Sequence, residues 1–245
     1  MTHVTCYISL ASKGGIVLNK LDSIKLNLQS LLKKYSHAWV FLYIPIYCVW
    51  FTRLEQDTTL KFSNVHSVLD NYIPFCEYFV IPYVLWFLYV GLTVGILFFQ
   101  TKHKDDFYKC FTLLVFGMTI ALIAYSFLPS VQHLRPNPMP RYNFFTRIVS
   151  FIYATDTPTN VCPSIHVFNA LAVHIAITHS HFFRDKKKIQ IASLVFCILI
   201  CISTVTLKQH SILDGVVSIG LILLLYPIVY KPGILWQEQP ATTKP

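Results

Sequence analysis

The sequence predicts an all-α fold: a bundle of six transmembrane helices, preceded in the chain by an amphipathic interfacial helix. Two properties of the whole chain point to this class. Of the 245 residues, 54% are hydrophobic and 13% are charged, and the mean hydropathy is +0.53. A soluble domain of this length does not need so much apolar sequence. In addition, apolar stretches recur six times, with polar or basic segments between them.

The segment before the first span, residues 1–36, is expected to lie in the cytoplasm. Residues 1–16 have no long apolar core behind a basic start, which predicts that no signal peptide is cleaved. From Val17 onwards, apolar residues repeat at spacings of four and three, and lysines lie off that stripe. The pattern is typical of an amphipathic helix. Such a helix either lies in the membrane interface or packs against the bundle.

The membrane domain is expected to cover residues 37–230, followed by an unstructured cytoplasmic tail, residues 231–245. Its first span is short and rich in Tyr and Trp, which favour the headgroup boundary. Pro74 and Pro82 predict a kinked or irregular outer end for the second span. Residues 144–153 are apolar and aromatic but too short to cross, so an interfacial helix is expected there. The six predicted spans are residues 37–52, 72–99, 107–128, 163–181, 189–207 and 212–230.

Lysine and arginine gather on one side of this arrangement, which predicts that this side, with both termini, is cytoplasmic. The basic side holds Lys13, Lys20, Lys25, Lys33, Lys34, Lys102, Lys104, Lys109, Arg184, Lys186, Lys187 and Lys188. The other side holds Arg53, Lys61, Arg135, Arg141, Arg147 and Lys208. The net charge of +9 is therefore interpreted as an orientation signal and an attraction to anionic lipid. The expected partner is the bilayer, and no nucleic acid.

Seven cysteines lie mostly inside apolar runs. Their odd number and their lack of paired ligand spacing argue against a disulfide framework and against a zinc site. We expect no metal and no cofactor.

The stretch 156–172, DTPTNVCPSIHVFNALA, places a polar turn before an apolar helical run. Pro163 is tolerated in the first helical turn, where its missing N–H costs nothing. The backbone N–H groups that follow then lack partners and, with the helix dipole, form an anion site. Ser164 adds a hydroxyl that either contacts phosphate or only caps the helix. His166 adds a proton donor in the same turn.

A second cluster lies at the start of the sixth span. His210 and Asp214 are four residues apart, which puts them on one face of a helix. The carboxylate either caps that helix or holds one imidazole N–H, which leaves the other ring nitrogen free to attack. Ser203 and Lys208 precede this pair.

A third cluster comes earlier, at Arg135 and Pro136. Arginine suits a phosphate because its planar fork donates two parallel hydrogen bonds. The alternative is an anchor that reaches to the interface. Asp156 and Asn160, between this cluster and the fourth span, are expected to shape the loop. In the six-span arrangement all three clusters lie at the extracytoplasmic face.

Arg-Pro at 135–136, Pro-Ser-x-His at 163–166 and Ser-x6-His-x3-Asp at 203–214 together resemble the type 2 phosphatidic acid phosphatase and vanadium haloperoxidase superfamily. The match covers residues 129–220. The resemblance implies a metal-independent reaction with a covalent phosphohistidine at His210, oriented by Asp214. It also implies that His166 gives a proton to the leaving group and then acts as base. Arg135 and Ser164 are the expected contacts to the phosphoryl oxygens.

Three positions depart from the commonest lipid-phosphatase pattern, which has lysine, glycine and arginine where this chain has Leu128, Ile165 and Thr204. Two phosphate-binding cations are therefore missing, and Lys208 and Arg141 are the candidates to replace them. This variant is more similar to the membrane branch that contains inositol phosphorylceramide synthases and many bacterial relatives. The branch suggests the plasma membrane of a bacterium.

The first functional hypothesis is a membrane phosphatase that hydrolyses a lipid phosphate or pyrophosphate. The second is a phosphotransferase that moves a phospho-headgroup to an alcohol such as inositol, ceramide or diacylglycerol. The third is a protein without catalytic activity that binds lipid headgroups; the missing cations favour it, and intact His166, His210 and Asp214 argue against it. A channel or transporter is disfavoured because no span carries a run of charges and no repeat is visible.

Overall fold

A computed structural model describes residues 25–57, 59–231 and 235 of the chain. The described residues are mostly helical, and their two strands have two residues each, which confirms the all-α prediction. The chain divides into two compact units, with the boundary between Leu42 and Tyr43. In the first unit, residues 25–34 are helical and a 3-10 helix, η1 (Ser36–Leu42), follows in the chain. Residues 17–24 of the predicted amphipathic helix, and nearly all of the predicted tail, lie outside the described residues.

The second unit contains residues 43–230 of the predicted membrane domain. Its α-helices are α2 (Tyr43–Gln56), α3 (Val80–Phe99), α4 (Lys104–Phe127), α5 (Phe144–Thr155), α6 (Ile165–His179), α7 (Lys187–Thr206) and α8 (Ile212–Tyr230). Short elements lie between them: β1 (Ser63–Asn64), η2 (Val68–Asn71), η3 (Glu77–Phe79) and β2 (Ser130–Val131). Among the described residues, four helical segments are long and apolar enough to cross a membrane, and they contain α3, α4, α7 and α8. With 14 and 15 residues, α2 and α6 fall short of the roughly 20 that a span usually needs.

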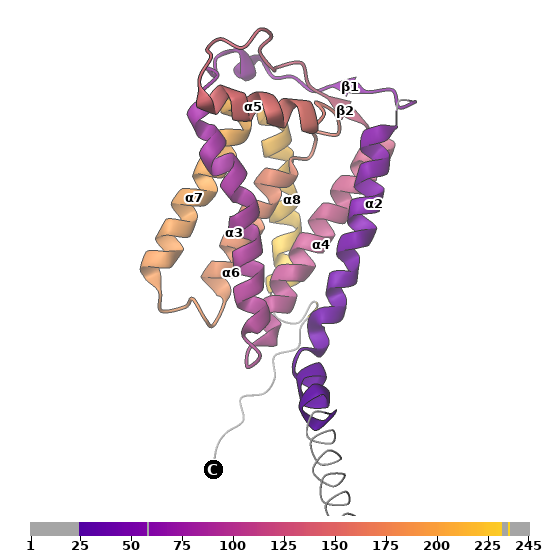
Figure 1. Ribbon diagram of the computed structural model, residues 1–245, viewed down its shortest axis with the longest axis vertical. Coiled ribbons are helices and arrows are strands. Elements are labelled where there is room, and N and C mark those ends of the chain that lie inside the picture. The colour runs from indigo at the N-terminus through magenta and orange to yellow at the C-terminus, as the bar shows by residue number, and fades with distance from the viewer. Residues whose placement is uncertain (1–24, 58, 232–234, 236–245) are drawn as a thin grey trace, which may run out of the picture. The chain divides into compact units, whose positions relative to one another are not determined.

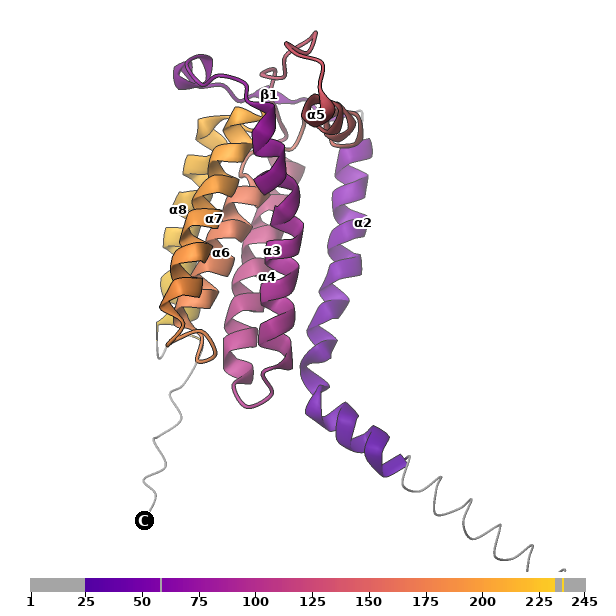
Figure 2. The same cartoon turned by 60° about the vertical axis from the view of Figure 1, so that its left-hand side comes forward.

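The helices α2, α3, α4, α6, α7 and α8 run lengthwise, and α5 lies across one end of them (Figures 1 and 2). We call this end the α5 end. The predicted interfacial helix, residues 144–153, corresponds to α5. It buries Val149 against Val80 and Tyr83 of α3 and leaves Phe144 and Phe151 exposed. One apolar face is therefore packed on the bundle, and aromatic side chains remain on the surface.

The centre of the bundle is α6, which packs against α3, α4, α7 and α8. A helix that is apolar on all sides is suited to such a position. The side chains of α6 are mostly small or β-branched, so the neighbouring helices can approach closely. Its buried apolar residues are Val167, Phe168, Ala170, Ala172, Val173, Ala176 and Ile177.

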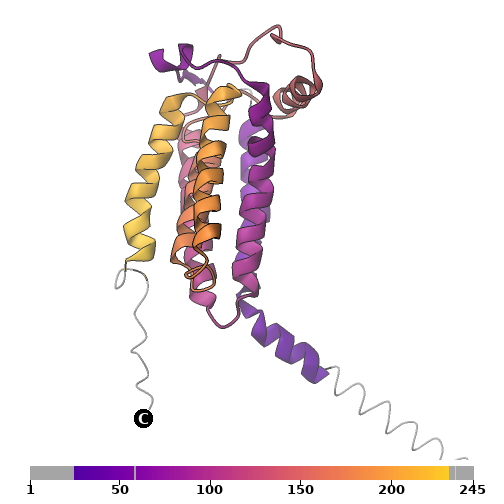
Figure 3. The same ribbon diagram turned by 90° about the vertical axis from the view of Figure 1, so that its left-hand side faces the viewer.

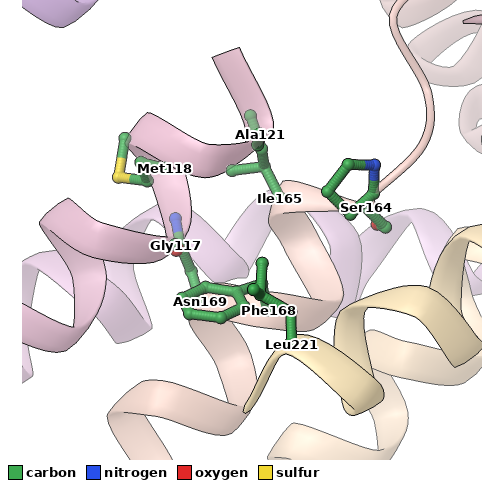
Figure 4. Close-up of a pocket in the computed structure, with 9 residues that line it drawn as sticks. Gly117, Met118, Ala121, Ser164, Ile165, Phe168, Asn169 and Leu221 are labelled. Atoms are coloured by element: carbon green, nitrogen blue, oxygen red, sulfur yellow. The ribbon is translucent and has the colours of Figure 1, made fainter. Parts of the chain in front are cut away.

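One contact between α4 and α6 depends on a glycine. The ring of Phe168 lies against Gly117, and an added Cβ there would come within 1.9 Å of the ring (Figure 4). The neighbouring space, which Ser164 and Leu221 also line, is too small to admit a water molecule. The helices therefore pack here without room for a methyl group.

Loops from distant parts of the sequence meet at the α5 end (Figure 3). The strands β1 and β2 pair in parallel there, with Ser63 opposite Ser130 and Asn64 opposite Val131. Val131 also bridges to Thr159. These contacts bring the loops that follow α2 and α4 to the segment that enters α6.

Candidate active site

The turn between α7 and α8 carries His210. After α7 ends, Lys208 adopts the left-handed conformation at φ 54°. The backbone N–H groups of Gln209 and His210 both donate to the Thr204 carbonyl, at 3.0 and 3.1 Å. A left-handed residue that closes a helix in this way is a common C-terminal cap. Ser211 then caps α8, so His210 is held between the end of one helix and the start of the next.

The carboxylate of Asp214 holds both His210 and the start of α8. Its Oδ2 accepts a hydrogen bond from Nδ1 of His210 at 3.2 Å and one from the backbone N–H of Ser211 at 2.9 Å. Because an ionised carboxylate only accepts, Nδ1 carries the proton, and Nε2 of the neutral ring keeps its lone pair. Helix capping and histidine orientation were alternatives from the sequence, and a single oxygen atom does both. His210 is buried, with 8% of its surface exposed.

His166, in the first turn of α6, lies beside His210, with their ring centroids 5.6 Å apart. Two aromatic side chains of α3 hold its ring. Tyr83 stacks on it and Trp86 is tilted against it, each at 4.5 Å between centroids. Sequence reasoning missed both residues, because two aromatic residues three positions apart in an apolar span look like ordinary packing.

Arg135 donates hydrogen bonds to the last turn of α5 and to the loop after it. Its Nη1 donates to the carbonyls of Tyr153 and Asp156, at 3.2 and 2.8 Å. Its Nη2 donates to the Thr157 carbonyl at 3.2 Å and to Oε1 of Gln209 at 2.6 Å. The guanidinium also lies over the Tyr153 ring, 4.6 Å from the centroid. Burial lowers the pKa of Arg135 from its ordinary value, and the contact with Gln209 places the side chain next to the histidine turn.

Two buried N–H donors next to this turn have no hydrogen-bond partner among the described residues. They are Nε of Arg135 and Nε2 of Gln209. Most buried donors in proteins are paired, and an anion is a natural acceptor for buried donors that have no partner. Sequence reasoning missed Gln209. Gln209 directly precedes His210 in the sequence, but this position indicates a role in the site only once Arg135 is known to contact Gln209.

Lys208 is not directed at the two histidines. Its Nζ donates to the carbonyls of Asp70 and Ile73, at 2.8 and 2.6 Å. Burial lowers the pKa of Lys208, and the nearby Asp70 carboxylate opposes that shift. The prediction that Lys208 replaces a missing phosphate-binding cation therefore finds no support in this geometry. The ammonium joins two loops instead, because burial next to carbonyls gives it partners inside the protein.

Arg141 is also engaged elsewhere. It forms a two-pronged ion pair with Glu77, from Nε to Oε1 at 2.8 Å and from Nη2 to Oε2 at 2.6 Å. Asn143 donates to the same carboxylate at 2.8 Å. Glu77 is fully buried, so its charge needs these partners. Arg141, which was predicted to contact phosphate, therefore fixes the loop before α5 to the segment Glu77–Phe79 at the start of α3.

Ser164 caps α6. Its Oγ accepts from the backbone N–H of Val167 at 3.4 Å, and the residue has no exposed surface. The capping alternative is the one that the structure shows for this hydroxyl. The prediction that Pro163 lies in the first helical turn is wrong, since α6 begins at Ile165. The proline precedes the cap, where its carbonyl accepts from the Tyr125 hydroxyl at 2.5 Å.

Asp70, in η2, accepts three hydrogen bonds at this end of the bundle, and sequence reasoning missed it. Its Oδ2 accepts from Oγ of Ser211 at 2.6 Å and from the backbone N–H of Ser67 at 2.7 Å. Its Oδ1 accepts from the backbone N–H of Ile212 at 2.8 Å. A local signal existed, because Ser67 and Asp70 form the Ser-x-x-Asp pattern of a capping box. Nothing local indicated the link to α8, which is 141 residues away along the chain.

Two further titratable groups lie close to the site. Burial raises the pKa of the Asp156 carboxyl from its usual value, although His210 and Arg135 are near enough to oppose the shift. The predicted role of Asp156, which is to shape the loop, stays a prediction. Burial also raises the pKa of the Cys162 thiol to about 12, assisted by the Asp214 carboxylate. A thiol with such a pKa is a poor nucleophile near neutral pH.

Within the described part of the chain, no group of three or more His, Cys, Asp or Glu side chains is arranged to hold a metal ion. Comparison of the chain with protein-family models, with curated proteins and with solved structures found no match. The similarity to the phosphatidic acid phosphatase superfamily stays a prediction that rests on the three sequence motifs. The geometry adds that His210, His166, Asp214 and Arg135 come together, whereas Lys208 and Arg141 face other partners.

Proposed function

We propose that this chain is an integral membrane enzyme that hydrolyses a phosphate or pyrophosphate ester of a lipid. The observation that carries the proposal is a histidine pair next to unpaired donors. His210 has its Nδ1 held by a carboxylate, a second imidazole lies 5.6 Å away, and the two free N–H groups belong to Arg135 and Gln209. An in-line nucleophile, a proton donor and positive dipoles for phosphoryl oxygens are what phosphoryl transfer requires.

The proposed reaction has two steps. In the first, the lone pair on Nε2 of His210 attacks phosphorus, the P–O bond to the leaving group breaks, and His166 gives that oxygen a proton. In the second, His166 takes a proton from water as the water oxygen attacks phosphorus. The P–N bond then breaks, inorganic phosphate leaves, and both histidines return to their starting states. Asp214 stabilises the positive charge on the His210 ring while the P–N bond exists.

The membrane topology is part of the proposal. Six spans, with α2 and α6 as the short ones, put the α5 end and the candidate site at the extracytoplasmic face. The distribution of lysine and arginine supports this orientation, because most of them lie in the segments at the opposite face. A bacterial plasma membrane is the proposed location, on the strength of the motif resemblance alone.

A second candidate function is transfer of a phospho-headgroup from one lipid to an alcohol. It is favoured by the engagement of Lys208 and Arg141 with other protein groups. Arg135 is then the one predicted cation that lies beside the histidines. A phosphodiester carries one negative charge, whereas a phosphomonoester carries about two near neutral pH. A site with a single arginine is better matched to the phosphodiester.

The test uses the purified full chain in detergent with a panel of phosphatidic acid, prenyl pyrophosphate and related lipids, in the presence of a chelator. Free phosphate is measured for the parent, for His210→Ala and for His181→Ala, a control at the opposite end of the bundle. We expect release by the parent and the control and none by His210→Ala. Transfer assays with labelled phospholipid donors and alcohol acceptors run in parallel. Release that persists in His210→Ala would contradict the mechanism, and failure of both assays would leave only lipid binding.

A further inference from the structure

Asp70 lies far along the chain from the three sequence motifs, but it directly contacts the turn between α7 and α8 that carries His210. It is 2% exposed, and three donors converge on its two carboxylate oxygens at 2.6–2.8 Å. Two of these donors belong to Ser211 and Ile212, the first residues after His210. A buried carboxylate with this many short bonds is held rigidly, because moving it would leave donors unpaired.

The segment 70–73 also contacts Lys208, two positions before His210. Nζ of Lys208 donates to the carbonyls of Asp70 and Ile73. The segment 70–73 therefore holds the turn on both sides of the histidine. Two further side chains hold the same turn. Gln132, in the loop after β2, donates to the Lys208 carbonyl at 3.0 Å, and Tyr153 of α5 donates to the Leu207 carbonyl at 2.6 Å.

We propose that Asp70 is a positioning residue for His210, a role that rests on the proposed function of His210 as the nucleophile. The link runs through Ser211. One oxygen of Asp214 accepts hydrogen bonds from the backbone N–H of Ser211 and from the ring of His210. Asp70 accepts a hydrogen bond from the hydroxyl of the same serine. The two carboxylates together fix the backbone that carries the imidazole. Reaction rates depend steeply on such placement, since a displacement of about 1 Å can lower them by about 100-fold.

Replacement by asparagine shows why the carboxylate is needed. An amide offers one acceptor oxygen and one NH2 group. If the oxygen accepts from Ile212, the NH2 group faces the N–H of Ser67; if the amide is turned round, it faces the N–H of Ile212. In either orientation one buried backbone N–H loses its partner. The change keeps the size of the side chain and loosens the start of α8.

The experiment compares the parent with Asp70→Asn and with Ser211→Ala. The second variant keeps the Asp70 charge and removes the bridging hydroxyl, which also accepts the capping bond from the Leu213 N–H of α8. Asp106→Asn is the matched control. Asp106 is also a buried carboxylate with a histidine partner, but it binds the N–H and the ring of His181 at the other end of the bundle. Each protein is labelled with 15N-histidine, and the His210 signals are assigned by their absence from His210→Ala. The variants are also assayed on the lipid that the parent turns over.

We expect Asp70→Asn to shift the His210 ring signals and to lower kcat by about 10- to 100-fold while KM changes less than about twofold. Ser211→Ala should do the same to a smaller extent, and Asp106→Asn should do neither. Unchanged His210 signals in Asp70→Asn and Ser211→Ala would overturn the proposal, as would an equal loss of kcat in Asp106→Asn. If the parent turned over no lipid, the proposed function would fail. Shifted His210 signals would still establish that Asp70 positions the imidazole.

Discussion

At the scale of single residues, the contact between His210 and Asp214 gives the sharpest prediction. Asp214→Asn retains an oxygen that can accept from the Ser211 N–H, so the cap on α8 survives. The amide cannot stabilise a positively charged imidazole as the carboxylate does. We expect kcat to fall by about 10²-fold or more, while the thermal unfolding midpoint changes little. Both are measured on purified protein in detergent.

Asp214→Ala separates the two roles of this side chain. It also removes the acceptor of the Ser211 N–H, which is one of the two bonds of the capping box, so the unfolding free energy should fall by about 1 kcal/mol relative to Asp214→Asn. The catalytic loss should be similar in both variants. If Asp214→Asn kept the activity of the parent, the carboxylate would only be a cap.

Two aspartates in loops should respond to pH with opposite signs. Burial raises the pKa of Asp156, so its ionised form destabilises the folded state above the unfolded pKa, near 3.8. Asp156→Asn should therefore raise the unfolding midpoint at pH 7, and this gain should shrink as the pH falls towards 3.8. The measurement is the difference in midpoint between variant and parent from pH 3.5 to 7.

Asp57 supplies the matched comparison. Its carboxylate accepts from the hydroxyl and the N–H of Thr59, and these bonds lower its pKa. Its stabilising effect is present at neutral pH and lost as the pH falls through the lowered pKa. Asp57→Asn should accordingly lower the midpoint at pH 7, with the difference vanishing on acidification. Two variants with the same sign of pH dependence would contradict this account.

The sequence predicted the pairing of His210 with Asp214 because the two residues are close along the chain. His210 and Asp214 are four residues apart, so helical geometry alone places them together. Asp70, Tyr83 and Trp86 could not be predicted in this way, because their partners lie 80 or more positions away. The same limit explains Lys208. Its charge was visible in the sequence, but the carbonyls that receive its hydrogen bonds belong to a loop about 135 residues earlier.

At the scale of elements, the packing of α6 against α4 depends on Gly117. An alanine there would place a methyl carbon 1.9 Å from the Phe168 ring, so the ring or the two helices would have to shift. Gly117→Ala should lower the unfolding free energy by about 1–3 kcal/mol. Gly91→Ala is the control, because a Cβ at that position of α3 meets nothing within 4 Å. It should be neutral or stabilising by up to about 1 kcal/mol. Equal effects of the two changes, measured by thermal unfolding in detergent, would show that the close contact is unimportant.

Element positions were predictable because apolar periodicity and length determine where a helix can run. Each predicted span overlaps a helix, although the ends differ by up to eight residues, the most at the start of α3. The start of α6 differed for a local reason. Ser164 takes the capping position and supplies the acceptor for the first turn, so the proline before it stays outside the helix. The expected array of free N–H groups pointing at a phosphate is thereby reduced, and more of the anion binding falls to Arg135 and Gln209.

At the scale of the whole molecule, the topology can be tested with four exposed positions. In a cysteine-free background, Tyr142→Cys and Lys61→Cys mark the α5 end, and Asp185→Cys marks the opposite end. Lys33→Cys lies before α2. Six spans with a cytoplasmic N-terminus predict that a membrane-impermeant maleimide labels Tyr142→Cys and Lys61→Cys on intact cells. The other two should react only after permeabilisation.

The pair Lys33→Cys and Lys61→Cys decides whether α2 crosses the membrane. With 14 residues, α2 is about 21 Å long, against a hydrocarbon core of about 30 Å. It can cross only if the residues before it in the chain, including η1, complete the span. Labelling of both positions from the same side would show that α2 does not cross. Labelling of Tyr142→Cys only after permeabilisation would reverse the orientation and place the histidine pair at the cytoplasmic face, where a lipid substrate would have to come from the inner leaflet.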